Sequence, residues 1–161
     1  MIRRISTADI PSICKIYNYY INNSIATFEE VEVGVEEMQK RVEQVSTNYP
    51  WIVYEEEGAV IGYAYANQWK TRSAYRYSAE ATVYLDHLYA GKGVGSKLYG
   101  HLISELNKSK IHSLIGGISL PNEASIALHE KFGFRKCAHF SEVGRKFDRW
   151  IDVGYWEKIF K

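Results

Sequence analysis

A glycine-rich segment near the middle of the chain has the residue types and spacing of an anion-binding loop. It reads Gly91-Lys92-Gly93-Val94-Gly95-Ser96, and it lies between a β-branched, aromatic run that ends at Leu85 and a helical pattern that carries Leu98. Backbone amides at such a junction converge on one point, glycines let a phosphate approach closely, and the helix dipole favours negative charge there. The segment matches neither a nucleotide-hydrolase loop nor Gly-x-Gly-x-x-Gly. We interpret it as a pyrophosphate site; the alternative is a glycine-rich turn without a ligand.

The same segment resembles the hallmark of the GNAT N-acetyltransferase superfamily, Arg/Gln-x-x-Gly-x-Gly/Ala after a strand. The matching stretch is Ala90-Gly91-Lys92-Gly93-Val94-Gly95, so Ala90 stands where the family usually has Arg or Gln. This replacement removes a side chain but no backbone amide, and we expect main-chain binding of a pyrophosphate to survive it. Residues 122–134 resemble the second signature of the family, in which an Asn opens a helix that ends in Gly-Phe.

Further matches, spread over nearly the whole chain, resemble the phosphinothricin-type acetyltransferases. They are Thr27-Phe28-Glu29, Tyr75-Arg76, Glu80 with Val83-Tyr84, and residues 124–133 and 143–153. The resemblance implies direct transfer of an acetyl group from acetyl-CoA to the amine of a small amino acid or an analogue such as phosphinothricin, methionine sulfone or methionine sulfoximine. It implies no acyl-enzyme and no metal. Two alternatives are an acetyltransferase of protein N-termini and a non-catalytic module that senses CoA.

The resemblance also implies two catalytic side chains. Glu80 matches the acid that the family places at the acceptor end of a central strand, where it takes a proton from the ammonium group directly or through water. The alternative is a surface glutamate at a strand end. His129 sits where many members have a tyrosine that protonates the leaving thiolate, and an imidazole can do this near neutral pH. It fits equally well as a helix histidine packed against the sheet.

The remaining site residues divide between the coenzyme and the acceptor. The resemblance assigns the coenzyme to main-chain groups of Val83, Tyr84 and Leu85, to the loop Gly91, Lys92, Gly93, Val94, Gly95 and Ser96, and to the side chains of Asn122 and Lys131. Asn122 also suits a helix cap and Lys131 a solvated position. The resemblance assigns the acceptor to Phe28, Lys70, Arg72 and Tyr75, because a cationic side chain with forked donors suits the carboxylate of an amino acid. The alternative for these basic residues is an exposed loop without a ligand. Trp69 and Trp150 either line the same cleft or pack in the core.

The elements that must position these residues follow from hydrophobic periodicity. Helices are predicted at residues 7–20, 35–45, 93–108 and 122–132, and strands at 51–55, 59–69, 80–85, 113–118, 134–140 and 153–158. Glu57-Gly58 predicts a hairpin turn between the first two strands. The order indicates one mixed α/β domain over residues 1–161. The resemblance implies a central, mostly antiparallel sheet, splayed at the cofactor site, with helices on both faces.

Composition excludes several classes of protein. Of the 161 residues, 46% are hydrophobic and 24% charged, which is typical of a globular domain. The net charge of +1 offers no bulk field for nucleic acid or an anionic membrane. Without a membrane-length apolar segment or a signal peptide, we expect a cytoplasmic protein. Cys14 and Cys137 lack metal-ligand spacing and are interpreted as buried thiols. The resemblance implies a homodimer.

Overall fold

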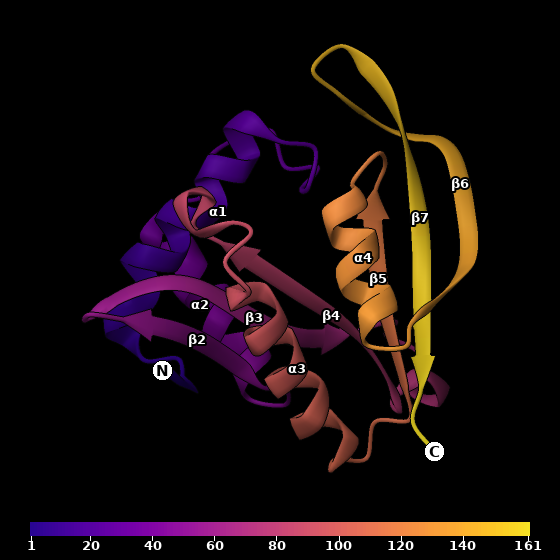
Figure 1. Ribbon diagram of the computed structural model, residues 1–161, viewed down its shortest axis with the longest axis horizontal. Coiled ribbons are helices and arrows are strands. Elements are labelled where there is room, and N and C mark those ends of the chain that lie inside the picture. Colours follow the sequence, from indigo (N-terminus) through magenta and orange to yellow (C-terminus); the bar gives the residue numbers. More distant parts are fainter.

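One twisted sheet of seven strands organises the fold, in the order β1-β2-β3-β4-β5-β7-β6 (Figure 1). The computed structural model describes residues 1–161. The strands are β1 (Ile2–Arg4), β2 (Trp51–Glu56), β3 (Ala59–Gln68), β4 (Ser78–Leu85), β5 (Ser113–Ser119), β6 (Arg135–Lys146) and β7 (Arg149–Ile159). Only the β4–β5 pair is parallel, which confirms the mostly antiparallel sheet.

Helices cover both faces of the sheet, as predicted. On one face lie α1 (Ile10–Asn23) and α2 (Val35–Ser46), and on the other lie α3 (Val94–Asn107) and α4 (Glu123–Lys131). Strand side chains alternate between two apolar cores: Ile52 packs with the α3 side, whereas its neighbours Trp51 and Val53 pack with α1 and α2. Successive residues of a regular strand therefore face opposite sides of the sheet. Three short 3-10 turns join the main elements: η1 (Thr7–Asp9), η2 (Ser73–Tyr75) and η3 (His87–Tyr89).

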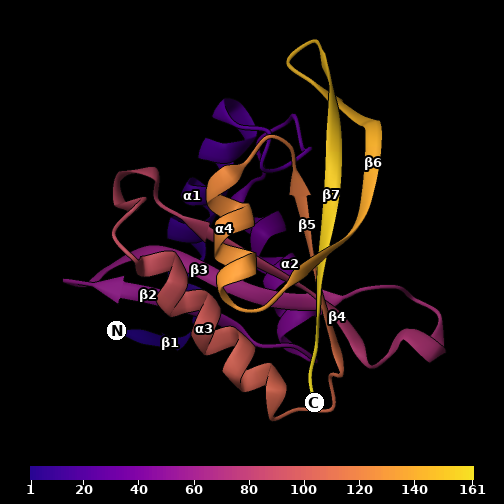
Figure 2. The same ribbon diagram turned by 45° about the vertical axis from the view of Figure 1, so that its right-hand side comes forward.

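The sheet divides into a fork at its centre. Strands β4 and β5 pair only over Ser78–Glu80 and Ser113–Ile115. Beyond this point β4 continues alongside β3 to Leu85, and β5 continues alongside β7 to Ser119. Figures 1 and 2 show the two strands diverging, with α4 beside the gap. The splayed sheet is therefore confirmed, and Glu80 is the last residue of β4 that pairs across the fork.

The C-terminal hairpin is longer than its sequence pattern indicates. Strands β6 and β7 extend over residues that were not predicted as strand, and their arm rises beyond the rest of the sheet (Figure 2). The pattern fails because the register shifts between Lys136 and Ala138 and again between Phe140 and Gly144, so the alternation of apolar residues is broken. Strand β1, only three residues long, was not predicted either.

The two cysteines have different environments. Cys14 is buried under α1, as expected. The expectation for Cys137 is wrong: its thiol is exposed, because β6 is the edge strand of the sheet, and its Sγ lies 3.4 Å from the carbonyl oxygen of Tyr155. None of the helices combines the length and the apolar character needed to cross a membrane.

Candidate active site

A cleft of about 950 Å³ opens at the fork. Its walls come from the segment after α1, the diverging half of β4, the glycine loop, the end of β5 and α4. The predicted site residues that line it are Glu80, Val83, Tyr84, Leu85, Gly91, Gly93, Gly95, Ser96, Asn122, His129 and Lys131. The predicted residues that do not line it are Lys92, Val94, Phe28, Lys70, Arg72 and Tyr75. The structure thus brings the catalytic and most of the coenzyme candidates together and leaves the acceptor candidates outside.

The glycine loop presents unpaired amides to this cleft. None of the N–H groups of residues 91–96 donates to an acceptor within the protein. Gly91 (φ +77°) and Gly93 (φ +79°) have left-handed backbones that favour glycine, and Gly93 forms the N-cap of α3. Lys131 reaches the loop from α4, with its Nζ 3.1 Å from Ser96 Oγ. Free amides, a helix N-terminus and an ammonium group therefore converge where an anion is expected.

Two residues of the loop differ from the others. The ammonium group of Lys92 lies 4.7 Å from the ring centre of Tyr89, so only its backbone remains close to the predicted anion position. The side chain of Val94 packs in the core beneath α3. Their amides are unpaired like those of their neighbours.

Strand β4 offers an open edge to the fork. Asp86 donates its N–H to Ile61 O, and the unbroken register places the backbone groups of Tyr84 on the β3 side as well. The N–H and C=O of Val83 and Leu85 therefore point into the fork. The carbonyl of Leu85 accepts a hydrogen bond from the hydroxyl of Tyr20 at 2.7 Å. Tyr84 contributes its side chain to the wall instead of its main chain.

Glu80 stands at the closed end of the fork, on the α1 and α2 face. Its carboxylate makes no hydrogen bond within the protein, and Gly117 of β5 leaves space beside it: a Cβ at residue 117 would lie 3.6 Å from Glu80 Oε1. Burial raises the pKa of the Glu80 carboxyl, and the positive charge of Lys70 partly opposes this effect. A carboxylate with a raised pKa and no protein partner can accept a proton from a ligand.

An aromatic group that the sequence did not indicate lies beside Glu80. Tyr155 of β7 pairs with Gly117 of β5, and a Cβ at residue 117 would lie 3.1 Å from Cε1 of the Tyr155 ring. Trp69 and Phe140 stand edge-on to Tyr155, with ring centres 5.6 and 5.8 Å from it. These residues meet through a pairing of strands that lie far apart in the sequence, so no local pattern could have revealed them. Trp69 therefore packs against Tyr155 and does not itself line the cleft.

The other acceptor candidates lie elsewhere in the chain. Arg72 caps η2 and Tyr75 ends it, before the first residue of β4, whereas the cleft opens beyond Glu80 toward the other end of that strand. Lys70 places its ammonium 4.9 Å from the ring centre of Trp69. Trp150 is exposed on the hairpin arm, so it neither lines the cleft nor packs in the core.

His129 is held on the α3 and α4 face of the sheet. Its Nδ1 donates to Ser125 O at 2.7 Å, whereas its buried Nε2 has no partner. The imidazole packs between Tyr99 and Phe134, against the backbone of Gly116. Burial lowers the pKa of His129, partly opposed by the Ser125 contact. In its neutral form the imidazole has its one proton committed to Ser125, so Nε2 can accept a proton but not donate one.

Asn122 serves as the cap of α4. Its side-chain oxygen accepts the N–H of Ser125 at 3.1 Å, which satisfies one of the free amides at the start of the helix. The side-chain amide nitrogen has no partner within the protein, and Asn122 lines the cleft. Capping therefore leaves a hydrogen-bond donor available to a ligand.

Comparison with known proteins agrees with this geometry. Residues 2–154 match the acetyltransferase (GNAT) domain family. A phosphinothricin N-acetyltransferase of Streptomyces viridochromogenes is 38% identical over 160 residues, covering 99% of this chain and 87% of its own length. An L-methionine sulfoximine/L-methionine sulfone acetyltransferase of Salmonella typhimurium is 36% identical, covering 96% of this chain and 91% of its own.

Solved structures show the same fold. A phosphinothricin acetyltransferase from Sinorhizobium meliloti in complex with AcCoA superposes with a TM-score of 0.96 at 34% identity, over 99% of this chain and 88% of that one. A protein described as ribosomal-protein-alanine N-acetyltransferase from Brucella melitensis gives 0.96 at 38% identity, over 99% of both chains. With a domain match over nearly its whole length and relatives above 30% identity, the chain belongs to the GNAT acetyltransferase family and is an acyltransferase.

Proposed function

We propose that this acyltransferase moves the acetyl group of acetyl-CoA directly to the amine of a small amino acid or an analogue of the phosphinothricin, methionine sulfone or methionine sulfoximine type. The observation that carries the proposal is the fork, where the free carboxylate of Glu80, the open edge of β4 and the unpaired amides of residues 91–96 share one cleft. The named activities of the relatives support the acceptor class.

The residues of the cleft fit the parts of acetyl-CoA. The loop amides and Lys131 form the anion site that would hold the diphosphate. Val83 has both main-chain groups free for the amides of an extended arm, in the manner of strand addition, and Leu85 adds its N–H. When bound, the coenzyme supplies the activated thioester carbonyl. Asn122 offers its side-chain amide at the far wall.

Glu80 and His129 take different roles in this proposal. An amino-acid ammonium is mostly protonated at neutral pH and must lose a proton before it attacks, which Glu80 can accept directly or through water. Neutral His129 carries its proton on Nδ1, which donates it to Ser125 O, so the free Nε2 can only accept a proton. Its expected donation to the thiolate requires a second proton, which burial opposes.

Release of free CoA thiol with a panel of amines tests the activity. We expect turnover with phosphinothricin, methionine sulfone or methionine sulfoximine, and none with a peptide that carries the same N-terminal residue. Turnover of peptides alone supports an acetyltransferase of protein N-termini instead. The similar Brucella melitensis structure, described as a ribosomal-protein-alanine N-acetyltransferase, favours this alternative. Intact CoA binding with no turnover of any amine supports a sensor. The role of Arg72 as a contact for the acceptor carboxylate stays a prediction, because Arg72 lies outside the cleft; on this prediction Arg72→Ala raises KM for free amino acids and leaves peptides unaffected.

We infer further that the enzyme acts as a homodimer in the cytoplasm. The hairpin arm supports the dimer, because it exposes four large apolar side chains: Phe140, Val143, Phe147 and Trp150. Monomeric proteins rarely expose such groups together. Sedimentation of the wild type and of Trp150→Glu tests this inference; a wild type that sediments as a monomer at micromolar concentration contradicts it.

A further inference from the structure

A buried ammonium group joins the C-terminal hairpin to the segment that follows α1. Lys146, the last residue of β6, is 2% exposed. Its Nζ donates to Ser24 O at 2.7 Å and to Thr27 O at 2.8 Å, and it lies 3.5 Å from Tyr20 O. A buried cation is costly unless its donors are satisfied, and here carbonyl oxygens at the C-terminal end of a helix replace water, where the helix dipole favours positive charge.

A second contact lies on the same face of β6. Gly144, two residues before Lys146, touches the ring of Phe28 so closely that a Cβ at residue 144 would lie 2.3 Å from Phe28 Cε2. The glycine is required by this approach, because any side chain would push the ring away. Lys146 and Gly144 together therefore seat residues 24–28 on the tip of the hairpin.

The segment held in this way is a wall of the catalytic cleft. Ser24, Ile25, Ala26 and Thr27 all line the cleft, whereas Lys146 does not. Tyr84, on the open half of β4, donates its hydroxyl to Ala26 O at 3.3 Å. The wall is thus fixed on its inner side by the strand that forms the fork and on its outer side by Lys146.

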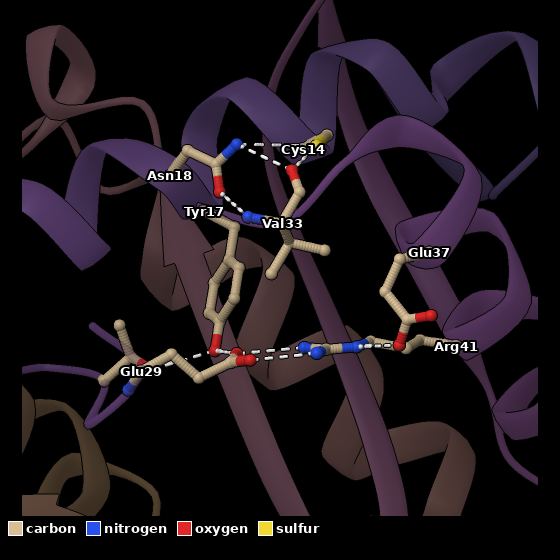
Figure 3. A network of polar contacts seen from close by, with 8 residues as sticks. Cys14, Tyr17, Asn18, Glu29, Val33, Glu37 and Arg41 are labelled. Atoms are coloured by element: carbon tan, nitrogen blue, oxygen red, sulfur yellow. Dashed lines mark hydrogen bonds and ion pairs between the residues drawn. The ribbon is translucent and has the colours of Figure 1, made fainter. Parts of the chain in front are cut away.

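The other end of the same segment is anchored independently. Figure 3 shows Tyr17 and Arg41 meeting the carboxylate of Glu29. The Arg41 guanidinium donates to both oxygens of Glu29, at 2.8 and 2.9 Å, and the hydroxyl of Tyr17 lies 2.8 Å from Thr27 Oγ1. Because this network holds residues 27–29 to α1 and α2, loss of Lys146 would free the outer side of the wall without unfolding the segment.

We propose that Lys146 is a positioning residue for the acceptor: through Ser24 and Thr27 it holds the wall of the cleft on the face where Glu80 receives the amine. This inference rests on the proposed function. Lys146 does not line the cleft, and the anion site at residues 91–96 lies on the opposite helix layer, at the start of α3. Its loss should therefore weaken use of the acceptor more than use of acetyl-CoA.

Steady-state kinetics of Lys146→Met tests the proposal, with Arg145→Met as the matched control, since Arg145 is the adjacent residue and faces solvent. We expect the KM of the acceptor to rise about tenfold or more, because small displacements from productive geometry are expensive. The KM of acetyl-CoA should stay within about twofold, Lys146→Arg should recover part of the loss, and Gly144→Ala should reproduce it. Hydrogen exchange should show faster amides in residues 24–28 of Lys146→Met.

Two results would overturn the proposal. One is an unchanged acceptor KM in Lys146→Met. The other is an equal loss in both KM values and in kcat that follows the folded fraction measured by thermal melting, which indicates a purely structural role. A wild type that acetylates no amine contradicts the proposed function, whereas an active wild type with an insensitive Lys146→Met contradicts only the role of Lys146.

Discussion

Replacing Glu80 by Gln tests the chemistry of the fork most directly. Glutamine keeps the size of the side chain and removes only the ability to take a proton. Because the carboxylate makes no hydrogen bond within the protein, the substitution breaks no internal contact. A general base contributes about 10²–10⁴-fold to the rate, so we expect kcat to fall by this factor near neutral pH, equivalent to about 3–5 kcal/mol in the activation barrier.

The pH dependence follows from the ionisation of Glu80 and of the acceptor. Burial raises the pKa of Glu80, so wild-type kcat/KM should rise with pH along an acidic limb that lies above the range of an ordinary glutamate, and E80Q should lack this limb. The neutral fraction of the acceptor amine increases as the pH approaches the pKa of that amine. Because solvent can then remove the proton without Glu80, the defect of E80Q should shrink as the pH rises from 7 to 9.

The assay is release of CoA thiol at saturating acetyl-CoA, with Glu56→Gln, an exposed carboxylate at the end of β2, as control. Because burial raises the pKa of Glu80, its ionised form opposes folding at neutral pH. E80Q should therefore melt at the same temperature as the wild type or higher, which separates lost chemistry from lost structure. A stable E80Q that keeps its activity within about threefold, or that retains the acidic limb, refutes the role of Glu80 as base.

Three further predictions concern charges around the site and the fold. Lys70→Met removes the positive charge that opposes the raised pKa of Glu80, so the acidic limb of kcat/KM should move to higher pH; an unmoved limb contradicts the coupling. Lys131→Met removes the ammonium next to Ser96, and the KM of acetyl-CoA should rise while its salt dependence falls, with the acceptor KM unchanged. Asp9 is buried in an ion pair that lowers the pKa of its carboxyl to about 2. Its roughly 2 kcal/mol of stability should be present above pH 4 and be lost as pH falls toward 2, so thermal melts of Asp9→Asn and wild type should converge in acid.

The local elements, the backbone of the glycine loop and the cap of α4 could be predicted from the sequence because their signals are local. The glycines at 91 and 93 mark left-handed backbone before a helix, and the structure has this conformation. Asn122 begins α4 as a cap, as its position indicates. Helical periodicity placed Leu98 and Leu102 in the core beneath α3. Each of these features depends on residues within a few positions of one another.

The surroundings of Glu80 could not be predicted because they are built by pairing between distant segments. Tyr155 reaches Glu80 only through the register of β7 against β5, which no short window contains. The seat of Phe28 on Gly144 joins residues more than a hundred positions apart. The hydrogen bond from His129 to Ser125, which decides what the imidazole can do, is local, but the burial that lowers its pKa comes from the packing of α4 on the sheet.

The fork also affects which positions of the amino-acid sequence tolerate substitution. In the proposed mode, the groups that the fork offers to the coenzyme are mostly main-chain groups, in Val83 and in residues 91–96. Every amino acid except proline carries such groups, but the left-handed backbones of Gly91 and Gly93 still favour glycine at these two positions. Ala90, which replaces the usual Arg or Gln of the family, is one substitution of this kind. The side chains beside Glu80, such as Tyr155, lie on a different face from the glycine loop. The proposed mode therefore predicts that substitutions beside Glu80 alter acceptor preference while binding of acetyl-CoA remains intact.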